Sequence, residues 1–237
     1  MPIISHQALQ LKWIQPTDIP NPKTLVLGSF NPFNPDGDTV DYYYGRSSNF
    51  FWKRIAVILG HEETFFLHRE QGFTRKLDAM SNRFCCLDIV NHIKVDGQND
   101  EVVNKYIKNR IFSNFADSEL FKSKFNGGNV NLRRVYNETV LETLKNTKSI
   151  NKVIHTMGPR RITDRIRGNP KELNRGTDGL FGFMSQVFDT CDKRDIALVF
   201  DSFSPSAYAV KNKSTQIPDL DNWLIEHLHL DGNNAME

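Results

Sequence analysis

The sequence predicts an α/β protein, a three-layer α/β/α sandwich around a short, mainly parallel central sheet. Short apolar runs of near-continuous hydrophobicity recur along the chain, which is typical of strands buried on both faces of a parallel sheet. Segments with apolar residues at spacings of three and four separate these runs, as expected for helices that cover such a sheet. A length of 237 residues, 39% of them hydrophobic, is enough to build a core of this kind.

The expected strands, loops and domain limits follow from the same patterns. Strands are expected over residues 24–29, 84–90, 152–155 and 196–200. Loops are expected over residues 30–48, 126–131 and 168–182, where Gly, Asn and Pro are frequent. We expect residues 1–230 to form a single domain with insertions and residues 231–237 to form a frayed tail.

Three helices are expected from apolar stripes. The first covers residues 49–59, with Ser47 or Ser48 as its cap. The second stripe consists of Leu132, Val135, Tyr136, Val140 and Leu144. The third consists of Leu220, Trp223, Leu224 and Leu228, with Asp219 in a position to cap the helix.

Composition excludes several classes of protein. The three cysteines, Cys85, Cys86 and Cys191, show no CxxC spacing, so we expect neither a disulfide framework nor a metal site, and no cofactor. No apolar run approaches the ~18 residues of a membrane span, and the N-terminal residues lack a signal-peptide pattern, so we expect a cytoplasmic protein without a membrane partner. A net charge of +2 neither indicates nor excludes DNA binding. No obligatory protein partner is indicated.

The residues in the last part of the expected strands and just after them are the candidate site, because ligands of parallel sheets bind beyond the carboxyl ends of the strands. These residues are Gly28 to Pro32, Asp88, His155 to Gly158 and Ser202 to Ala207. None of these segments is a G-x-S-x-G elbow, a P-loop or a G-x-G-x-x-G turn. The sequence therefore gives no support for an esterase, a nucleoside triphosphatase or a standard dinucleotide-binding enzyme.

Four short blocks resemble the uracil-DNA glycosylase superfamily. LVLGSFNP (25–32) followed by YYYGRSSNFFW (42–52) resembles the mismatch-specific uracil group, with its G-I-N-P-G and N-x-F-W, and the hypoxanthine group, with its G-S-F-P-G and Tyr-Tyr pair. FDSFSPSA (200–207) resembles the Ser/Pro loop of the superfamily, and CLDIV (86–90) resembles a strand of the hypoxanthine group. Asp201 and Ser202 stand where uracil-specific members carry a histidine, which argues against ordinary uracil chemistry.

The resemblance implies a catalytic pair. Asn31 aligns with the asparagine of G-I-N-P and would place the water, since a neutral amide orients water without a shifted pKa. Asp88 would activate water or stabilise the cationic sugar, because an acid in an apolar strand is costly to bury without purpose. Alternatively, Asn31 closes an Asx-Pro turn, and Asp88 caps a loop or pairs with a buried arginine.

A second group is expected to bind the flipped base. Ser29 and Phe30 lie at the end of the first expected strand, and Tyr43 and Tyr44 offer rings and hydroxyls. The other members of the group are Asn49, Phe51 and His155. Phe51, aligned with the phenylalanine of N-x-F-W, would stack on the base. The alternatives are a helix core for Phe51, a surface loop packed by its own aromatic residues for the tyrosines, and a hydrogen-bonded core histidine for His155.

A third group is expected to bind DNA phosphates: Ser202, Ser204, Pro205, Ser206, Arg160 and Arg161. Serine hydroxyls and backbone N–H groups suit phosphate oxygens, and residues 207–210 would supply an apolar wedge. An ordinary Ser-Pro turn and a solvated charge run are the plain alternatives.

These inferences predict a monofunctional DNA glycosylase that hydrolyses the N-glycosidic bond of a flipped base and leaves an abasic site. The base is expected to be uracil, hypoxanthine or a bulky modified cytosine of phage type, and the last would imply a role in defence. The alternatives are a catalytically silent nucleic-acid-binding module of the same fold and a hydrolase of free nucleosides or nucleotides.

Overall fold

A four-stranded parallel sheet forms the centre of the computed structural model. The structure describes residues 2–33, 40–68, 70–108, 123–125, 129–157, 179–199, 203–212 and 217–230. The sheet contains β2 (Thr24–Gly28), β3 (Phe84–Asp88), β7 (Lys152–His155) and β8 (Ala197–Leu198) in the order β3-β2-β7-β8, and every neighbouring pair is parallel. All residues of β2 and β3 are buried, as their continuous apolar sequence predicts.

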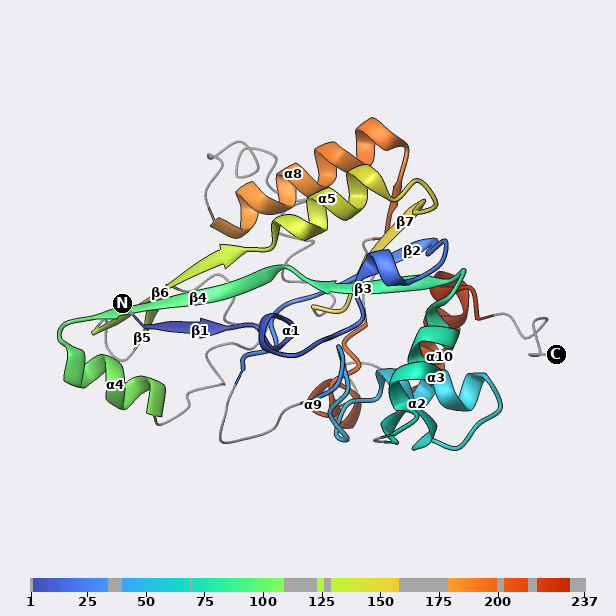
Figure 1. The fold of residues 1–237 in the computed structure, drawn as a ribbon, viewed down its shortest axis with the longest axis horizontal. Coiled ribbons are helices and arrows are strands. Elements are labelled where there is room, and N and C mark those ends of the chain that lie inside the picture. The colour runs from blue at the N-terminus through green and yellow to red at the C-terminus, as the bar shows by residue number, and fades with distance from the viewer. Residues whose placement is uncertain are drawn as a thin grey trace.

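Helices cover both faces of this sheet, which confirms the predicted α/β/α sandwich (Figure 1). On one face lie α5 (Glu138–Asn146) and α8 (Gly179–Arg194). On the other lie α2 (Phe51–Ile58), α3 (Gly72–Met80) and α10 (Ile217–Leu228). The described residues also form the short helices α1 (Gln7–Gln10) and α9 (Ala207–Lys211) and the 3₁₀ turns Pro16–Asp18 and Phe65–Leu67.

A second, antiparallel sheet extends the molecule beyond the carboxyl end of β3. It consists of β1 (Ile3–Ser5), β4 (Val90–Gly97), β6 (Val130–Tyr136) and β5 (Lys124–Phe125), in the order β1-β4-β6-β5. The chain passes from β3 through Ile89 directly into β4, so one extended segment belongs to both sheets (Figure 1). Helix α4 (Asp100–Lys108) packs on this sheet, where Val103 lies close to Gly97.

The second sheet corrects two sequence predictions. Residues 130–136 form a strand, so the predicted helical stripe from Leu132 to Leu144 is wrong in its first half and residues 130–131 are not a loop. Val130 and Leu132 are buried whereas Asn131 and Arg133 are exposed, which is the period of two of a half-buried strand. Helix α5 begins only after Asn137, whose side chain accepts a hydrogen bond from Thr139 N.

Other element limits differ by smaller amounts. Helix α2 begins at Phe51, and neither predicted serine caps it, since Asn49 Oδ1 accepts from Phe51 N at 2.9 Å. Helix α8 begins at Gly179, so residues 179–182 of the predicted loop 168–182 are helical. Residues 168–178 of that loop lie outside the described residues. The last strand is limited to Ala197–Leu198. The predicted tail, residues 231–237, also lies outside the described residues.

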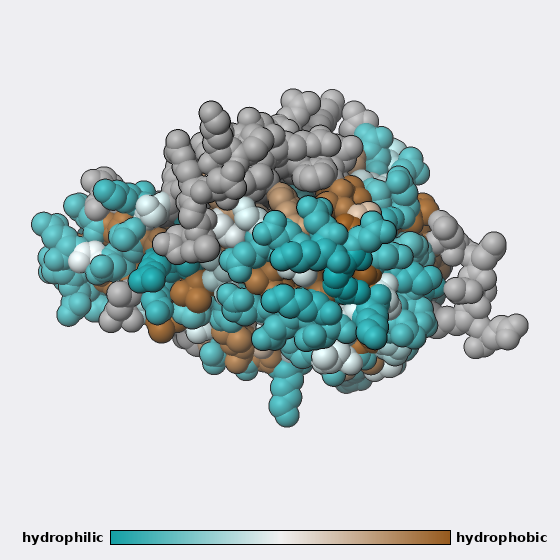
Figure 2. All heavy atoms as spheres, turned by 90° about the horizontal axis from the view of Figure 1, so that it is seen from above, coloured by the Kyte–Doolittle hydropathy of each residue, from teal (hydrophilic) through white to brown (hydrophobic). Residues whose placement is uncertain are grey.

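The hydrophobic core is continuous from the parallel sheet into the antiparallel one. All three cysteines are buried and free in it, and burial raises the pKa of the Cys191 thiol to about 12. Hydrophilic residues cover much of the face seen in Figure 2, with small apolar patches between them. Among the helices of the described ranges, none combines the length and the apolar character needed to cross a membrane.

Candidate functional site

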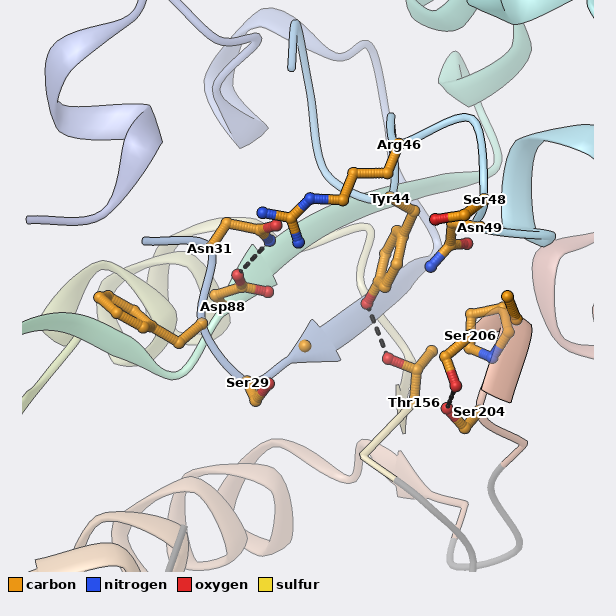
Figure 3. Close-up of a pocket in the computed structure, with 14 residues that line it drawn as sticks. Ser29, Asn31, Tyr44, Arg46, Ser48, Asn49, Asp88, Thr156, Ser204 and Ser206 are labelled. Atoms are coloured by element: carbon orange, nitrogen blue, oxygen red, sulfur yellow. Dashed lines mark hydrogen bonds between the residues drawn. The ribbon is translucent and has the colours of Figure 1, made fainter. Parts of the chain in front are cut away.

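A cavity of about 220 Å³ lies at the carboxyl ends of β2, β3 and β7. Three segments surround these ends: the turn after β2, the loop that precedes α2, and the serine loop (residues 203–207) that leads into α9 (Figure 3). The residues that line the cavity are Gly28, Ser29, Phe30, Asn31, Tyr44, Arg46, Ser48, Asn49, Asp88, Thr156, Ser204, Pro205, Ser206 and Ala207. The position agrees with the general placement of ligands at parallel sheets.

Asp88 is the carboxylate of this cavity. It is the last residue of β3 and only 2% exposed. Its Oδ2 atom accepts a hydrogen bond from Asn31 Nδ2 at 2.7 Å and lies 2.8 Å from His6 Nε2. Among the described residues, the partners of Asp88 are therefore a histidine and an asparagine and not the arginine considered as an alternative. The two residues predicted to be catalytic contact each other, and Oδ1 is directed toward the cavity (Figure 3).

Tyr44 forms the aromatic wall of the cavity. Its hydroxyl and Thr156 Oγ1 are 2.9 Å apart, which joins the loop to the end of β7. Its ring lies on the ring of Phe51, with a centroid distance of 4.4 Å. Phe51 is fully buried beneath it, so of these two stacked rings the one offered to a ligand is that of Tyr44. The backbone of Tyr44 has φ 59°, a left-handed conformation that turns the loop at this point.

Tyr43 and His155 lie outside this cavity. Tyr43 is 3% exposed and packs among His6, Trp13 and Tyr42. His155 is buried at the end of β7, and burial lowers its pKa from 6.5 to about 4, so the ring is neutral at neutral pH. Thr156, the next residue, lines the cavity in its place.

The serine loop forms the opposite rim. Ser204 Oγ and Ser206 Oγ are 3.1 Å apart, and Ser206 Oγ accepts from Ala209 N at the start of α9. Pro205 O accepts from Phe50 N at 2.8 Å, which ties this rim to the segment that carries Asn49. Tyr208, in the predicted wedge segment, is 79% exposed. The other predicted phosphate-binding residues, Ser202, Arg160 and Arg161, lie outside the described residues.

Several residues of the site had no role assigned from the sequence, and three of them are important for its geometry. Arg46 extends over the space beside Asn31 (Figure 3). It could have been predicted from the sequence because it lies inside the tyrosine-rich block 42–52. Thr156 lies in the segment from His155 to Gly158 that the sequence placed at a strand end, but no role was assigned to it. His6 had no signal, because it is separated from Asp88 by 82 residues and belongs to no motif.

Comparisons with known proteins do not assign the chain to a family. No protein-family model, no curated protein and no solved structure matches it. Within the described ranges, no three or more His, Cys, Asp or Glu side chains gather in a way that could hold a metal ion.

Proposed function

We propose that this protein is a monofunctional DNA glycosylase, which hydrolyses the bond between a flipped base and its deoxyribose and leaves an abasic site. The observation that carries the proposal is the contact of Asp88 with Asn31 at the floor of a cavity that has an aromatic wall. A carboxylate and an amide beside an aromatic face suit a reaction in which water attacks a sugar whose base is stacked.

Asp88 would act as the general base. Oδ2 is occupied by two donors, so Oδ1 is the oxygen that would accept a proton from water. The water oxygen bonds to C1′ of the sugar, the glycosidic bond breaks, and the base leaves with its electron pair. The negative charge of Asp88 would also stabilise the oxocarbenium character that develops at the sugar.

Asn31 would orient that water. Its Nδ2 atom donates to Asp88, which leaves the side-chain Oδ1 to accept a hydrogen bond from the water. The amide would thus hold the carboxylate and the nucleophile in one arrangement. Proximity of this kind supplies a large part of the rate enhancement in enzymes.

The remaining cavity residues would bind the nucleotide. Tyr44 would stack on the base, while Asn49 and Arg46 offer donors to its polar edge. Ser204 and Ser206 would contact phosphates, and Tyr208 on the adjoining helix would enter the duplex in place of the base. No lysine lines the described cavity, which favours hydrolysis over a lyase that forms a Schiff base.

The test is base release from defined DNA. Purified protein is incubated with duplex and single-stranded oligonucleotides that contain uracil, hypoxanthine, mismatched thymine or modified cytosines, and with phage DNA, and alkali then reveals abasic sites. We expect one base to be released. Asp88→Asn is expected to lower the single-turnover rate by about 100- to 10,000-fold, the usual contribution of general acid–base catalysis.

Matched variants separate this function from its rivals. Asp78→Asn changes an exposed carboxylate on α3 that does not line the cavity, and it should leave the rate unchanged. Tight DNA binding without abasic product would favour a silent binding module. Release of bases from free nucleosides, without salt-sensitive DNA binding, would favour a nucleoside hydrolase.

A further inference from the structure

His6 holds a hydrogen on a defined ring nitrogen. Its Nδ1 atom accepts a hydrogen bond from Ala8 N at 3.0 Å, as the cap of helix α1. A backbone N–H can only donate, so Nδ1 carries no proton and the hydrogen of the neutral ring lies on Nε2. Nε2 is 2.8 Å from Asp88 Oδ2. His6 is therefore the donor in this contact and Asp88 the acceptor.

The orientation of the His6 ring is fixed by packing. The residue is 3% exposed, and three aromatic rings surround it. Trp13 meets it edge to face with a centroid distance of 5.4 Å, and Phe30 and Tyr43 lie 5.7 Å away. The ring cannot rotate away from Asp88 without displacing these neighbours, because protein cores are closely packed.

The same N-terminal segment also fixes the second donor of Asp88. His6 N donates to Asn91 O at 3.0 Å, and Gln7 N donates to Asn31 O at 2.8 Å. Residues 6 and 32 form an isolated antiparallel bridge. The position of His6 and the position of Asn31 are thus coupled through the backbone.

We infer that His6 is a positioning residue of the site, which acts through Asp88 and does not touch the substrate. Together with Asn31 it saturates Oδ2, so that the carboxylate keeps one orientation and Oδ1 is the oxygen that faces the cavity. The inference rests on the proposed function for its catalytic consequence. The His6–Asp88 contact itself can be tested without any activity.

The kinetic test is a double-mutant cycle. His6→Leu removes the donor and is expected to slow single-turnover base release about 10- to 100-fold, the size of a lost hydrogen bond to a charged group. His6→Gln, which retains a donor at a comparable reach, should restore most of the rate. In an Asp88→Asn background, His6→Leu should change the rate less than about twofold, because residues that act through one another are not additive.

A merely structural role gives a different pattern. His6→Leu would then lower the melting temperature without changing the rate of the folded protein, or its effect would multiply with that of Asp88→Asn, and either result would overturn the inference. His61→Leu changes a histidine that stacks on Phe65 away from the cavity and serves as the matched control. It should leave the rate unchanged.

Nitrogen-15 NMR of the histidine rings supplies the activity-independent measurement. The expected result is that His6 has protonated Nε2 and unprotonated Nδ1, and that Asp88→Asn shifts the Nε2 signal. The opposite tautomer, or a signal insensitive to residue 88, would contradict the inference. The expected signals in a protein that releases no base would instead contradict the glycosylase proposal and leave the His6–Asp88 relation intact.

Discussion

Gly28 and Asp88 lie opposite each other in neighbouring parallel strands, and a Cβ atom at residue 28 would come within 2.1 Å of Asp88 Oδ1. The same Cβ atom would lie 2.9 Å from the Tyr44 hydroxyl. Only glycine leaves room for the carboxylate where the structure places it. The close approach of strand backbone and side chain is a recognised use of glycine within strands.

Gly28→Ala is therefore expected to abolish most activity. The added methyl group must displace the Asp88 carboxylate, and a displacement of about 1 Å can lower a rate by about 100-fold. The loss of stability should be about 1–3 kcal/mol, typical of overpacking. Single-turnover base release and urea unfolding measure the two effects. Full activity in this variant would show that the position of Oδ1 is unimportant.

Tyr44 is expected to contribute through its ring more than through its hydroxyl. Tyr44→Ala should weaken binding of single-stranded DNA by about 1–3 kcal/mol, the usual contribution of a stacked base. Tyr44→Phe keeps the ring and removes the hydroxyl that contacts Thr156, so it should bind normally and lose about 0.5–1.5 kcal/mol of stability. Fluorescence anisotropy and thermal unfolding check the two variants. Equal binding by both variants would remove Tyr44 from the proposed stacking role.

The parts of this fold that the sequence predicts are those with local patterns. β2, β3 and β7 were identified because burial on both faces produces continuous apolar runs. β6 was not, since Leu132, Val135 and Tyr136 fit a helical stripe with Val140 as well as they fit a strand. The pairing with β4 that decides between the two is a long-range contact.

The residues of the candidate site also fall into those that a local sequence pattern indicates and those that only a long-range contact reveals. Asn31, Asp88 and Tyr44 could be identified because each follows a strand end or lies in a motif. His6 could not, because its importance comes from a contact with a residue far along the chain. Phe51 shows the converse, since its motif position indicated a stacking residue whereas the structure places it under Tyr44.

His155 should make stability depend on pH in mildly acidic solution. Burial lowers its pKa from 6.5 to about 4 in the folded protein. Between these values the unfolded chain binds more protons, so this contribution is complete above pH 6.5 and is lost as the pH falls toward about 4. The loss is at most about 3.5 kcal/mol, from a shift of about 2.5 at 1.4 kcal/mol per pKa unit.

Urea unfolding at several pH values tests this prediction. The difference in unfolding free energy between pH 7 and pH 5 should be smaller in His155→Leu than in the wild-type protein, since the titrating group is gone. An unchanged pH dependence would mean that other groups account for acid sensitivity.

The stability of the folded protein should depend on Asp41, because Asp41 neutralises the buried Lys76 cation. Lys76 is fully buried, contacts Asp41 Oδ2, and lies 5.8 Å from the Trp52 ring centre. Asp41→Ala leaves this cation without its carboxylate and should cost about 1–3 kcal/mol. Lys76→Met should cost less, because the remaining Asp41 is 45% exposed and stays hydrated. Thermal unfolding of both variants gives the order, and the reverse order would refute this explanation.

The contact between α2 and α10 offers a stability change that should spare activity. Arg54 makes a bidentate contact with Asp221, through Nε at 2.7 Å and Nη2 at 2.5 Å. Arg54→Lys loses this geometry and should cost about 1 kcal/mol. Base release by the folded protein should not change, since neither residue lines the cavity. A loss of activity here would mean that the site responds to general destabilisation.

The direct passage of β3 into β4 also limits how the length of this segment can vary. Asp88 ends a parallel strand, and two residues later the chain is already paired in the other sheet. Side chains alternate between the faces of a strand, so the loss or gain of a single residue before Asp88 would turn the carboxylate to the opposite face. Insertions can accumulate in the loops of such a protein, whereas the number of residues between Phe84 and Gly97 is constrained by two sheets at once.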